Sequence, residues 1–148
     1  KGYAVDKIIE ILRPLENVLV DGGGDIRCLG TKFEDDKPFN WKVGLMNPCG
    51  KTNEFIDLPS EFSITCSGAQ ARKFGELNHL INPHKFDFKK DYDLAFIYGN
   101  SNEFEQTIPI NSKEKLLTTY CDTFSTVAYI IGDKIKKYLP KGLYVIFR

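Results

Sequence analysis

The sequence has few of the residues on which zinc and redox sites commonly depend. Its 148 residues include four cysteines, two histidines, one methionine and one tryptophan. The cysteines stand 21, 17 and 55 positions apart, so no Cys-x-x-Cys pair indicates a zinc site or a redox dithiol. An even count permits two disulfides. Cys28 and Cys66, however, lie in apolar, strand-like stretches, which favours free buried thiols.

An excess of charge and a long apolar run are also missing. Twenty basic residues balance 20 acidic ones, so the formal net charge of +0 gives no general reason to expect nucleic acid or an acidic membrane as partner. No apolar run approaches the length of a transmembrane segment, and residues 1–10 read directly as a helix rather than as a signal peptide. The GxGxxG and P-loop phosphate motifs are absent as well. The 42% apolar and 27% charged residues are typical of a globular domain.

The residues that are present predict one α+β domain over residues 1–148. Helical spacing of apolar residues predicts a helix over 4–12, and a second helix is predicted from about 122 to 131, ended by Gly132. We expect residues 31–40 to form a polar link, 47–53 a hairpin turn, 100–111 a loop, and Ser112 a helix cap. Because most strands are adjacent in sequence, the sheet should be mostly antiparallel and packed with helices. The predicted strands are 17–21, 25–30, 41–46, 54–58, 61–68, one within 75–84, 92–99 and 143–147.

Two glycine-containing stretches can present backbone N–H groups to a ligand. Residues 21–27 contain three consecutive glycines, whose N–H groups can form an anion-binding nest, although a plain tight turn explains the same residues and is favoured. Ser67 and Gly68 end a predicted strand, with Arg72 and Lys73 close behind. That stretch is either a ligand-facing turn or a solvated one.

Both histidines fall within residues 78–84. His79 is a candidate general base, because imidazole titrates near neutral pH, and a histidine hydrogen-bonded to backbone is the plainer alternative. The spacing of His79 and His84 matches no zinc site, because a third ligand is not evident.

A carboxylate and a hydroxyl occur together in an otherwise apolar helix. Asp122 and Thr126 are four residues apart, which places them on one helix face. Asp122 as a helix N-cap and Thr126 bonded to a backbone carbonyl is one interpretation, and solvent exposure is another. The functional interpretation is half of a Mg²⁺ site that a phosphorylated ligand completes.

Six motifs occur in a fixed order along the chain: KGYAVD, VDGGGDIR, WKVGL, TCSG, NHLINP and DTFSTVAYIIG. In this order, over Lys1 to Gly132, they resemble the C-terminal half of the ApbE family in a divergent form. This family comprises the FAD:protein FMN transferases, formerly described as thiamine biosynthesis lipoproteins. Family sequences are similar to AKGYAVD, GGDI, TSGDYER, SHIIDPRTG and ADALATAL in the matching places.

The resemblance implies an ApbE-type, T-fold-like domain and a Mg²⁺-dependent transfer of FMN from FAD to a Thr or Ser hydroxyl of a target protein. It implies that Asp122 and Thr126 hold Mg²⁺ and that His79 assists the transfer, as a base or by positioning. FAD and the acceptor protein would be the partners, and the location would be periplasmic or membrane-anchored. The residues that would bind or border the flavin nucleotide are Lys1, Asp6, Gly23, Gly24, Asp25, Ser67 and Gly68.

The sequence also departs from the family motifs. SGDYER is replaced by SGAQAR, Asn82 stands where the family has an acid, and residues 99–120 look inserted. The residue before Lys1, whose carbonyl completes the family's metal site, and the N-terminal half are outside this sequence. Three hypotheses therefore stand: a flavin transferase or a fragment of one, a nucleotide-binding member without turnover or an FAD pyrophosphatase, and a structural domain.

Overall fold

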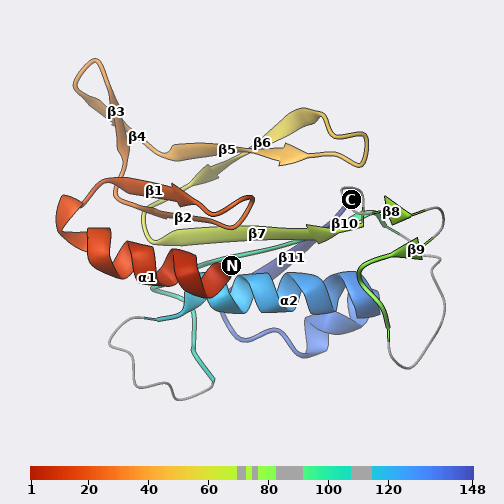
Figure 1. Ribbon diagram of the computed structural model, residues 1–148. Helices are drawn as coiled ribbons and strands as arrows, with labels where there is room; N and C mark the ends of the chain where they lie inside the picture. The colour runs from red at the N-terminus through yellow and green to blue at the C-terminus, as the bar shows by residue number, and fades with distance from the viewer. Residues whose placement is uncertain (70–72, 75–76, 83–91, 108–114) are drawn as a thin grey trace.

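The computed structural model describes residues 1–69, 73–74, 77–82, 92–107 and 115–148. The chain forms three layers, with two helices below a five-stranded sheet and a β-hairpin above it (Figure 1). Helix α1 (Gly2–Leu12) continues into a short 3₁₀ helix, η1 (Arg13–Leu15). Helix α2 (Leu117–Ile131) continues into another, η3 (Gly132–Lys137).

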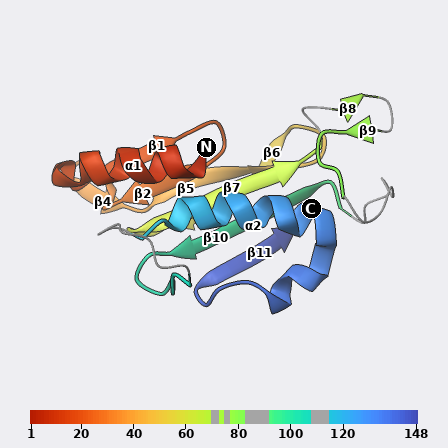
Figure 2. The same ribbon diagram turned by 60° about the horizontal axis from the view of Figure 1, so that its bottom comes forward.

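The central sheet has the strand order β1-β2-β7-β10-β11, and every neighbouring pair is antiparallel. The hairpin above it consists of β5 (Trp41–Met46) and β6 (Thr52–Leu58), and Figure 2 shows this hairpin on the face away from α2. The expectation of an α+β fold with a mostly antiparallel sheet is therefore confirmed. The strands of the sheet are β1 (Val18–Asp21), β2 (Ile26–Leu29), β7 (Phe62–Gly68), β10 (Leu94–Asn100) and β11 (Leu143–Phe147).

Alternation along the strands divides the apolar core in two. On β10, Ala95 and Ile97 belong to the apolar cluster between the sheet and α2, whereas Leu94 and Phe96 belong to the cluster between the sheet and the hairpin. Successive side chains of a strand point to opposite faces, so one apolar strand serves both layers. On β7 the faces differ in kind, because Ile64 faces the hairpin cluster and Ser63 faces α2.

The prediction of a polar link over residues 31–40 is wrong. The structure forms a second hairpin there, β3 (Lys32–Glu34) and β4 (Lys37–Phe39). Asp35 and Asp36 make the two-residue turn with φ of 49° and 59°, a left-handed pair that matches the twist of antiparallel strands. Aspartate tolerates this conformation. The hairpin was not predicted because the stretch is rich in charged residues, which are more typical of a loop. A two-residue pair, β8 (Lys73–Phe74) with β9 (Leu77–Asn78), follows β7, and β9 falls within the stretch 75–84 where a strand is predicted.

Helix α2 begins earlier than the sequence predicts. It starts at Leu117 rather than near Asp122, so Asp122 lies inside the helix and the interpretation of Asp122 as its N-cap is wrong. The predicted end at Gly132 is confirmed, with φ of 67° at that residue. Ser112, expected to cap a helix, lies outside the described residues.

The first turn of α2 is capped by a residue from the other helix. Asp6 of α1 accepts hydrogen bonds from the backbone N–H groups of Thr118 (3.0 Å) and Thr119 (2.8 Å), 112 and 113 residues away. A carboxylate at a helix N-terminus satisfies donors that have no intrahelical partner and complements the helix dipole. The same carboxylate pairs with Arg27 of β2, and both side chains are 1% exposed. One buried ion pair therefore joins α1, the sheet and α2.

All four cysteines are free, as the strand-like surroundings of Cys28 and Cys66 indicated. Burial raises the pKa of Cys28 to about 11 and that of Cys66 to about 12. Burial also raises the pKa of Cys121. These three thiols are therefore protonated near neutral pH and are poor nucleophiles, whereas Cys49 is exposed. In the described part of the chain, no helix has the length and apolar character needed to cross a membrane.

Replacing Asp6 with alanine should destabilise the fold strongly. The substitution leaves the buried Arg27 with only its longer 3.8 Å contact to Glu61 as an ion pair and removes the cap of α2. Breaking a buried pair in this way costs about 3–5 kcal/mol. Urea denaturation followed by circular dichroism measures the change. The matched control is Glu34→Ala, which breaks the exposed Lys32–Glu34 pair and should cost at most about 1 kcal/mol. Equal losses in the two variants would contradict the role given to Asp6.

Candidate functional site

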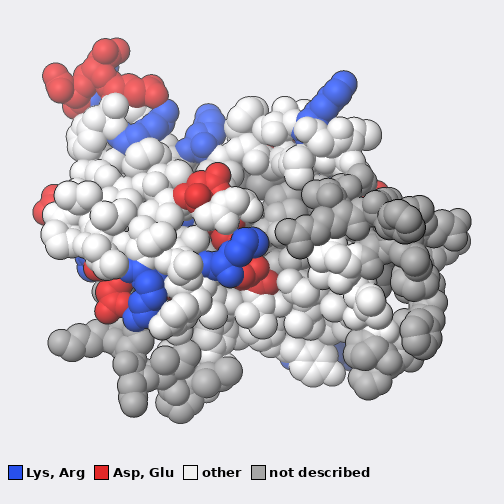
Figure 3. Space-filling model, viewed as in Figure 1, with Lys and Arg blue, Asp and Glu red and all other residues white. Residues whose placement is uncertain are grey.

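Charged and hydroxyl side chains gather where the start of α1 crosses the middle of α2. Acidic and basic groups lie next to each other in Figure 3 at the place where Figure 1 shows the amino terminus. The cluster, here called the junction cluster, draws on α1, the β1–β2 turn, β7 and α2. Its members are Lys1, Gly2, Asp25, Ser67, Asp122, Ser125 and Thr126.

Asp122 is held by the backbone of α1. Its Oδ2 accepts a hydrogen bond from the Gly2 N–H at 2.9 Å, and its side chain is 27% exposed. A Cβ placed on Gly2 would lie 2.5 Å from the Thr118 carbonyl oxygen and 2.9 Å from the Asp122 Cβ. The close crossing of the two helices therefore requires glycine at this position.

The hydroxyl of Thr126 faces strand β7. Its Oγ1 lies 3.1 Å from Ser67 Oγ, and Ser67 Oγ lies 2.8 Å from Ser125 Oγ. Thr126 Oγ1 also lies 3.3 Å from the backbone oxygen of Asp122. A bond from Thr126 to a backbone carbonyl was one interpretation of the sequence, and this contact is present but long. Asp122 and Thr126 share the helix face that the four-residue spacing predicts.

Asp25 is a fully buried carboxylate with only one of its oxygens bonded. Its side chain is 0% exposed, and Oδ2 accepts a hydrogen bond from Lys1 Nζ at 2.7 Å. Oδ1 is buried and has no hydrogen-bond partner. Burial raises the pKa of Asp25, with a smaller contribution from the negative charge of Asp122, while Lys1 opposes the rise. A buried carboxyl oxygen without a donor is costly.

The three glycines form the turn between β1 and β2. Gly22 N–H donates to the Asp25 carbonyl at 2.9 Å, and Gly24 N–H donates to Asp21 Oδ1 at 2.8 Å. Gly23 and Gly24 have φ of 76° and 92°, with no atom within 4 Å of a Cβ built on either. The favoured interpretation as a tight turn therefore agrees with the structure. The turn also delivers Asp25 to the junction cluster.

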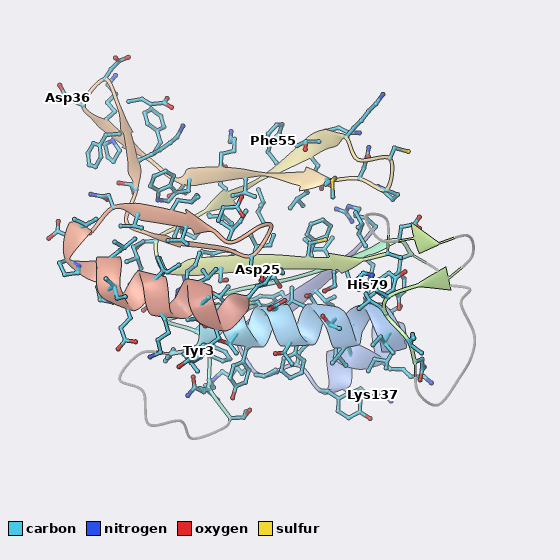
Figure 4. All side chains as sticks on the ribbon, viewed as in Figure 1. Tyr3, Asp25, Asp36, Phe55, His79 and Lys137 are labelled. Carbon is cyan, nitrogen blue, oxygen red and sulfur yellow. The ribbon has the colours of Figure 1, made fainter. Side chains whose placement is uncertain are left out.

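The other sequence candidates lie outside the cluster. Asp6 caps α2 and pairs with Arg27, as described above. Gly68 ends β7, where a Cβ would lie 2.7 Å from the Asp93 carbonyl oxygen. His79 follows β9 and is exposed. Figure 4 shows His79 beside β9 and Asp25 near the start of α1. Within the described residues, His79 has no hydrogen bond to the cluster.

Sequence reasoning did not single out Gly2, Ser125 or Arg27. Gly2 and Ser125 lie within the first and the last of the six quoted motifs, but their contacts depend on how α1 and β7 pack on α2. The arginine after the glycine turn was a visible signal, because a lone Arg in a four-residue apolar strand needs a buried partner.

The donor set of the junction cluster fits a hard cation. The Asp122 carboxylate and the Thr126 hydroxyl are oxygen ligands of the kind that Mg²⁺ prefers. Among the described residues, no group of three or more His, Cys, Asp and Glu side chains can hold a metal ion. A cation here would need further oxygens from water or from the phosphates of a ligand, which is the usual arrangement for Mg²⁺.

The three-layer α+β fold gives the structural class of the domain, and sequence comparison gives the family. Residues 1–89 match the sequence model of the ApbE family. The FAD:protein FMN transferase of Treponema pallidum (strain Nichols) is 32% identical over 113 residues, which cover 67% of this chain and 31% of that protein. The chain therefore belongs to the ApbE family.

Two solved structures share the fold of this chain. The flavin transferase ApbE from Vibrio cholerae superposes with a TM-score of 0.64 at 18% identity, over 99% of this chain and 48% of that one. The flavinyl transferase ApbE of Pseudomonas stutzeri, in its apo form, gives a TM-score of 0.58 at 17% identity, over 99% and 43%. The chain thus spans less than half the length of these relatives.

Replacing Asp25 with asparagine should stabilise the protein at neutral pH. Burial raises the pKa of the folded carboxyl above its unfolded value of about 3.9. The folded state therefore holds the proton more tightly, and the wild type loses stability as the pH rises from about 4 through the folded pKa. The asparagine variant avoids this loss.

The measurement is the difference in unfolding free energy between Asp25→Asn and wild type, taken by urea denaturation from pH 3 to pH 8. The advantage of the variant should grow as the pH rises and then level off. Asp57→Asn, at an exposed aspartate, should show no such trend. A variant that is less stable than wild type at pH 7 would contradict the cost assigned to the buried carboxylate.

Proposed function

We propose that this chain provides the metal-binding part of an FAD:protein FMN transferase. The observation that carries the proposal is the pairing of Asp122 and Thr126 on one face of α2, beside Lys1 and the half-bonded carboxylate of Asp25. Membership in the ApbE family and the activity for which the treponemal relative is named supply the reaction class.

The proposed reaction is a phosphoryl-type transfer. A Thr or Ser hydroxyl oxygen of the acceptor protein bonds to the FMN phosphorus of FAD, the diphosphate P–O bond breaks, and AMP leaves. The hydroxyl proton passes to a base, for which His79 remains our prediction. Mg²⁺ held by Asp122 and Thr126 would neutralise charge on the diphosphate.

The residues around the pair would orient the nucleotide. The Gly2 N–H fixes the Asp122 carboxylate through Oδ2. Lys1 provides a cation 2.7 Å from Asp25, and its exposed ammonium can also pair with a phosphate. The β1–β2 turn, with Gly23 and Gly24, would border the nucleotide. Ser67 and Gly68 end the strand that supports the pair.

A second candidate is a member that binds FAD without transferring FMN. The changes from SGDYER to SGAQAR and from the family acid to Asn82 favour this alternative, because they replace acidic side chains and a tyrosine of the family motifs. FAD hydrolysis, with water in place of the acceptor hydroxyl, is a third outcome. Incubation with FAD, Mg²⁺ and a threonine-containing acceptor peptide separates them, because only the transferase attaches FMN to the peptide.

Replacing Asp122 with asparagine should abolish binding that depends on FAD and Mg²⁺ together. Asparagine keeps an acceptor for the Gly2 N–H but removes the charge that a divalent cation needs. At a ligand concentration about 100 times Kd, binding stabilises the folded state by about 2.7 kcal/mol, or about 5–10 °C in Tm for a domain of this size. Thermal unfolding with FAD, with Mg²⁺ and with both measures the shift.

The matched control is Asp133→Asn, at an aspartate that is 76% exposed in η3. It should keep the full joint shift. A joint shift that survives in Asp122→Asn would place the metal elsewhere, and no shift in the wild type would count against a nucleotide site in this chain.

A further inference from the structure

Three hydroxyl groups between β7 and α2 have fewer protons than contacts. Ser67 Oγ contacts Ser125 Oγ at 2.8 Å and Thr126 Oγ1 at 3.1 Å. Ser125 Oγ lies 2.9 Å from the Asp122 backbone oxygen, and Thr126 Oγ1 lies 3.3 Å from the same oxygen. Each hydroxyl donates one proton and the carbonyl donates none. Only three of the four contacts are therefore hydrogen bonds at any moment.

The distances decide which contact is left out. In one arrangement Ser125 donates to the carbonyl, Ser67 donates to Ser125, and Thr126 donates to Ser67, which omits the 3.3 Å contact. In the reverse arrangement Thr126 donates to the carbonyl and the 2.9 Å contact is omitted. In two further arrangements Ser125 and Thr126 both donate to the carbonyl, and the 2.8 Å or the 3.1 Å contact of Ser67 is omitted. Hydroxyl hydrogen bonds cluster near 2.7–2.8 Å and weaken with distance. The first arrangement keeps the three shortest contacts and is favoured.

The favoured arrangement has a consequence for Thr126. Its proton points to Ser67, so neither of its oxygen lone pairs is used by the three hydroxyl contacts. A hydroxyl that binds a cation must offer a lone pair to it and direct its proton elsewhere. In the reverse arrangement a Thr126 lone pair accepts the Ser67 proton, which leaves the oxygen less suited to a cation.

We propose that Ser67 is a positioning residue for the metal ligand Thr126. Its oxygen accepts the Thr126 proton and thereby aims a lone pair of Thr126 at the cation shared with Asp122. Groups that orient metal ligands in this way affect metal affinity without touching the metal. The inference rests on the proposed metal site and adds to it a residue on β7.

Strand β7 offers a matched control for this role. Ser63 lies on the same face as Ser67, four residues earlier, and its Oγ contacts the Ile26 carbonyl at 2.9 Å and Thr118 Oγ1 at 3.1 Å. Like Ser67, it bonds a threonine hydroxyl of α2 in the helix–sheet interface. Its partner is not a proposed ligand, so a purely packing role predicts similar behaviour for both serines and the positioning role does not.

The experiment measures Mn²⁺ binding, as a paramagnetic substitute for Mg²⁺, by the loss of the free Mn²⁺ electron paramagnetic resonance signal in the presence of FAD. Wild type is compared with Asp122→Asn, Ser67→Ala, Ser67→Thr and Ser63→Ala, and the thermal unfolding of each metal-free protein reports folding. Ser67→Ala should weaken Mn²⁺ binding about 10- to 100-fold. Ser67→Thr should restore most of the affinity, because it keeps the hydroxyl, and Ser63→Ala should leave it unchanged. If Ser67→Ala does not fold, Ser67→Cys replaces it, since a thiol keeps the volume but is a weak acceptor.

The outcomes separate this inference from the function on which it rests. Weak binding in Asp122→Asn and Ser67→Ala, with rescue by threonine, supports both. If Mn²⁺ binding is weak in Asp122→Asn but equal to wild type in Ser67→Ala, the positioning role is overturned and the proposed metal site is still supported. Equal losses in Ser67→Ala and Ser63→Ala also overturn it, in favour of packing. No effect of Asp122→Asn, or no Mn²⁺ binding by wild type, overturns the metal site itself.

Discussion

One carboxylate, that of Asp6, determines how the helices and the sheet meet. It accepts two backbone N–H groups of α2 and pairs with Arg27 of β2, so it joins the three elements at a single buried point. The cost of burying its charge is offset only because each partner is in place. Once α1 is fixed there, its first turn lies against α2, and the Gly2 N–H reaches Asp122. The geometry of the candidate site thus depends on a residue outside the junction cluster.

The helix-facing side of β7 shows a second constraint. Ser63, Thr65 and Ser67 alternate along it, whereas Ala95 and Ile97 occupy the same face of the neighbouring β10. An apolar β7 would bury more hydrocarbon beneath α2 and would leave no hydrogen-bond partner for Thr126. Thr65 Oγ1 is itself buried without a partner. The polar strand therefore lowers stability in the interface, and the hydroxyl contacts to α2 recover part of that cost.

Local patterns predicted most of the fold because most of its signals are local. Alternating apolar residues marked the strands, and Gly132 marked the end of α2. The start of α2 was missed because Thr118 and Thr119 are weak helix formers, and their cap comes from Asp6, 112 residues away. The i, i+4 spacing did place Asp122 and Thr126 on one face. No spacing predicts that Ser67 and Gly2 meet them, since those contacts depend on the register of the sheet and the crossing of two helices.

The burial of Asp25 bears on whether this domain is merely structural. A structural turn gains nothing from a fully buried carboxylate with one oxygen unbonded, because asparagine or serine would fill the same space without a charge. The nearby charge of Asp122 adds to the cost by raising the pKa of Asp25 further. The Lys1 ammonium bonds Oδ2 of the buried carboxylate, and Oδ1 is left without a hydrogen-bond donor. A carboxyl group whose pKa is raised by burial and by a neighbouring charge is more typical of functional sites than of structural turns, which supports the binding role that we propose.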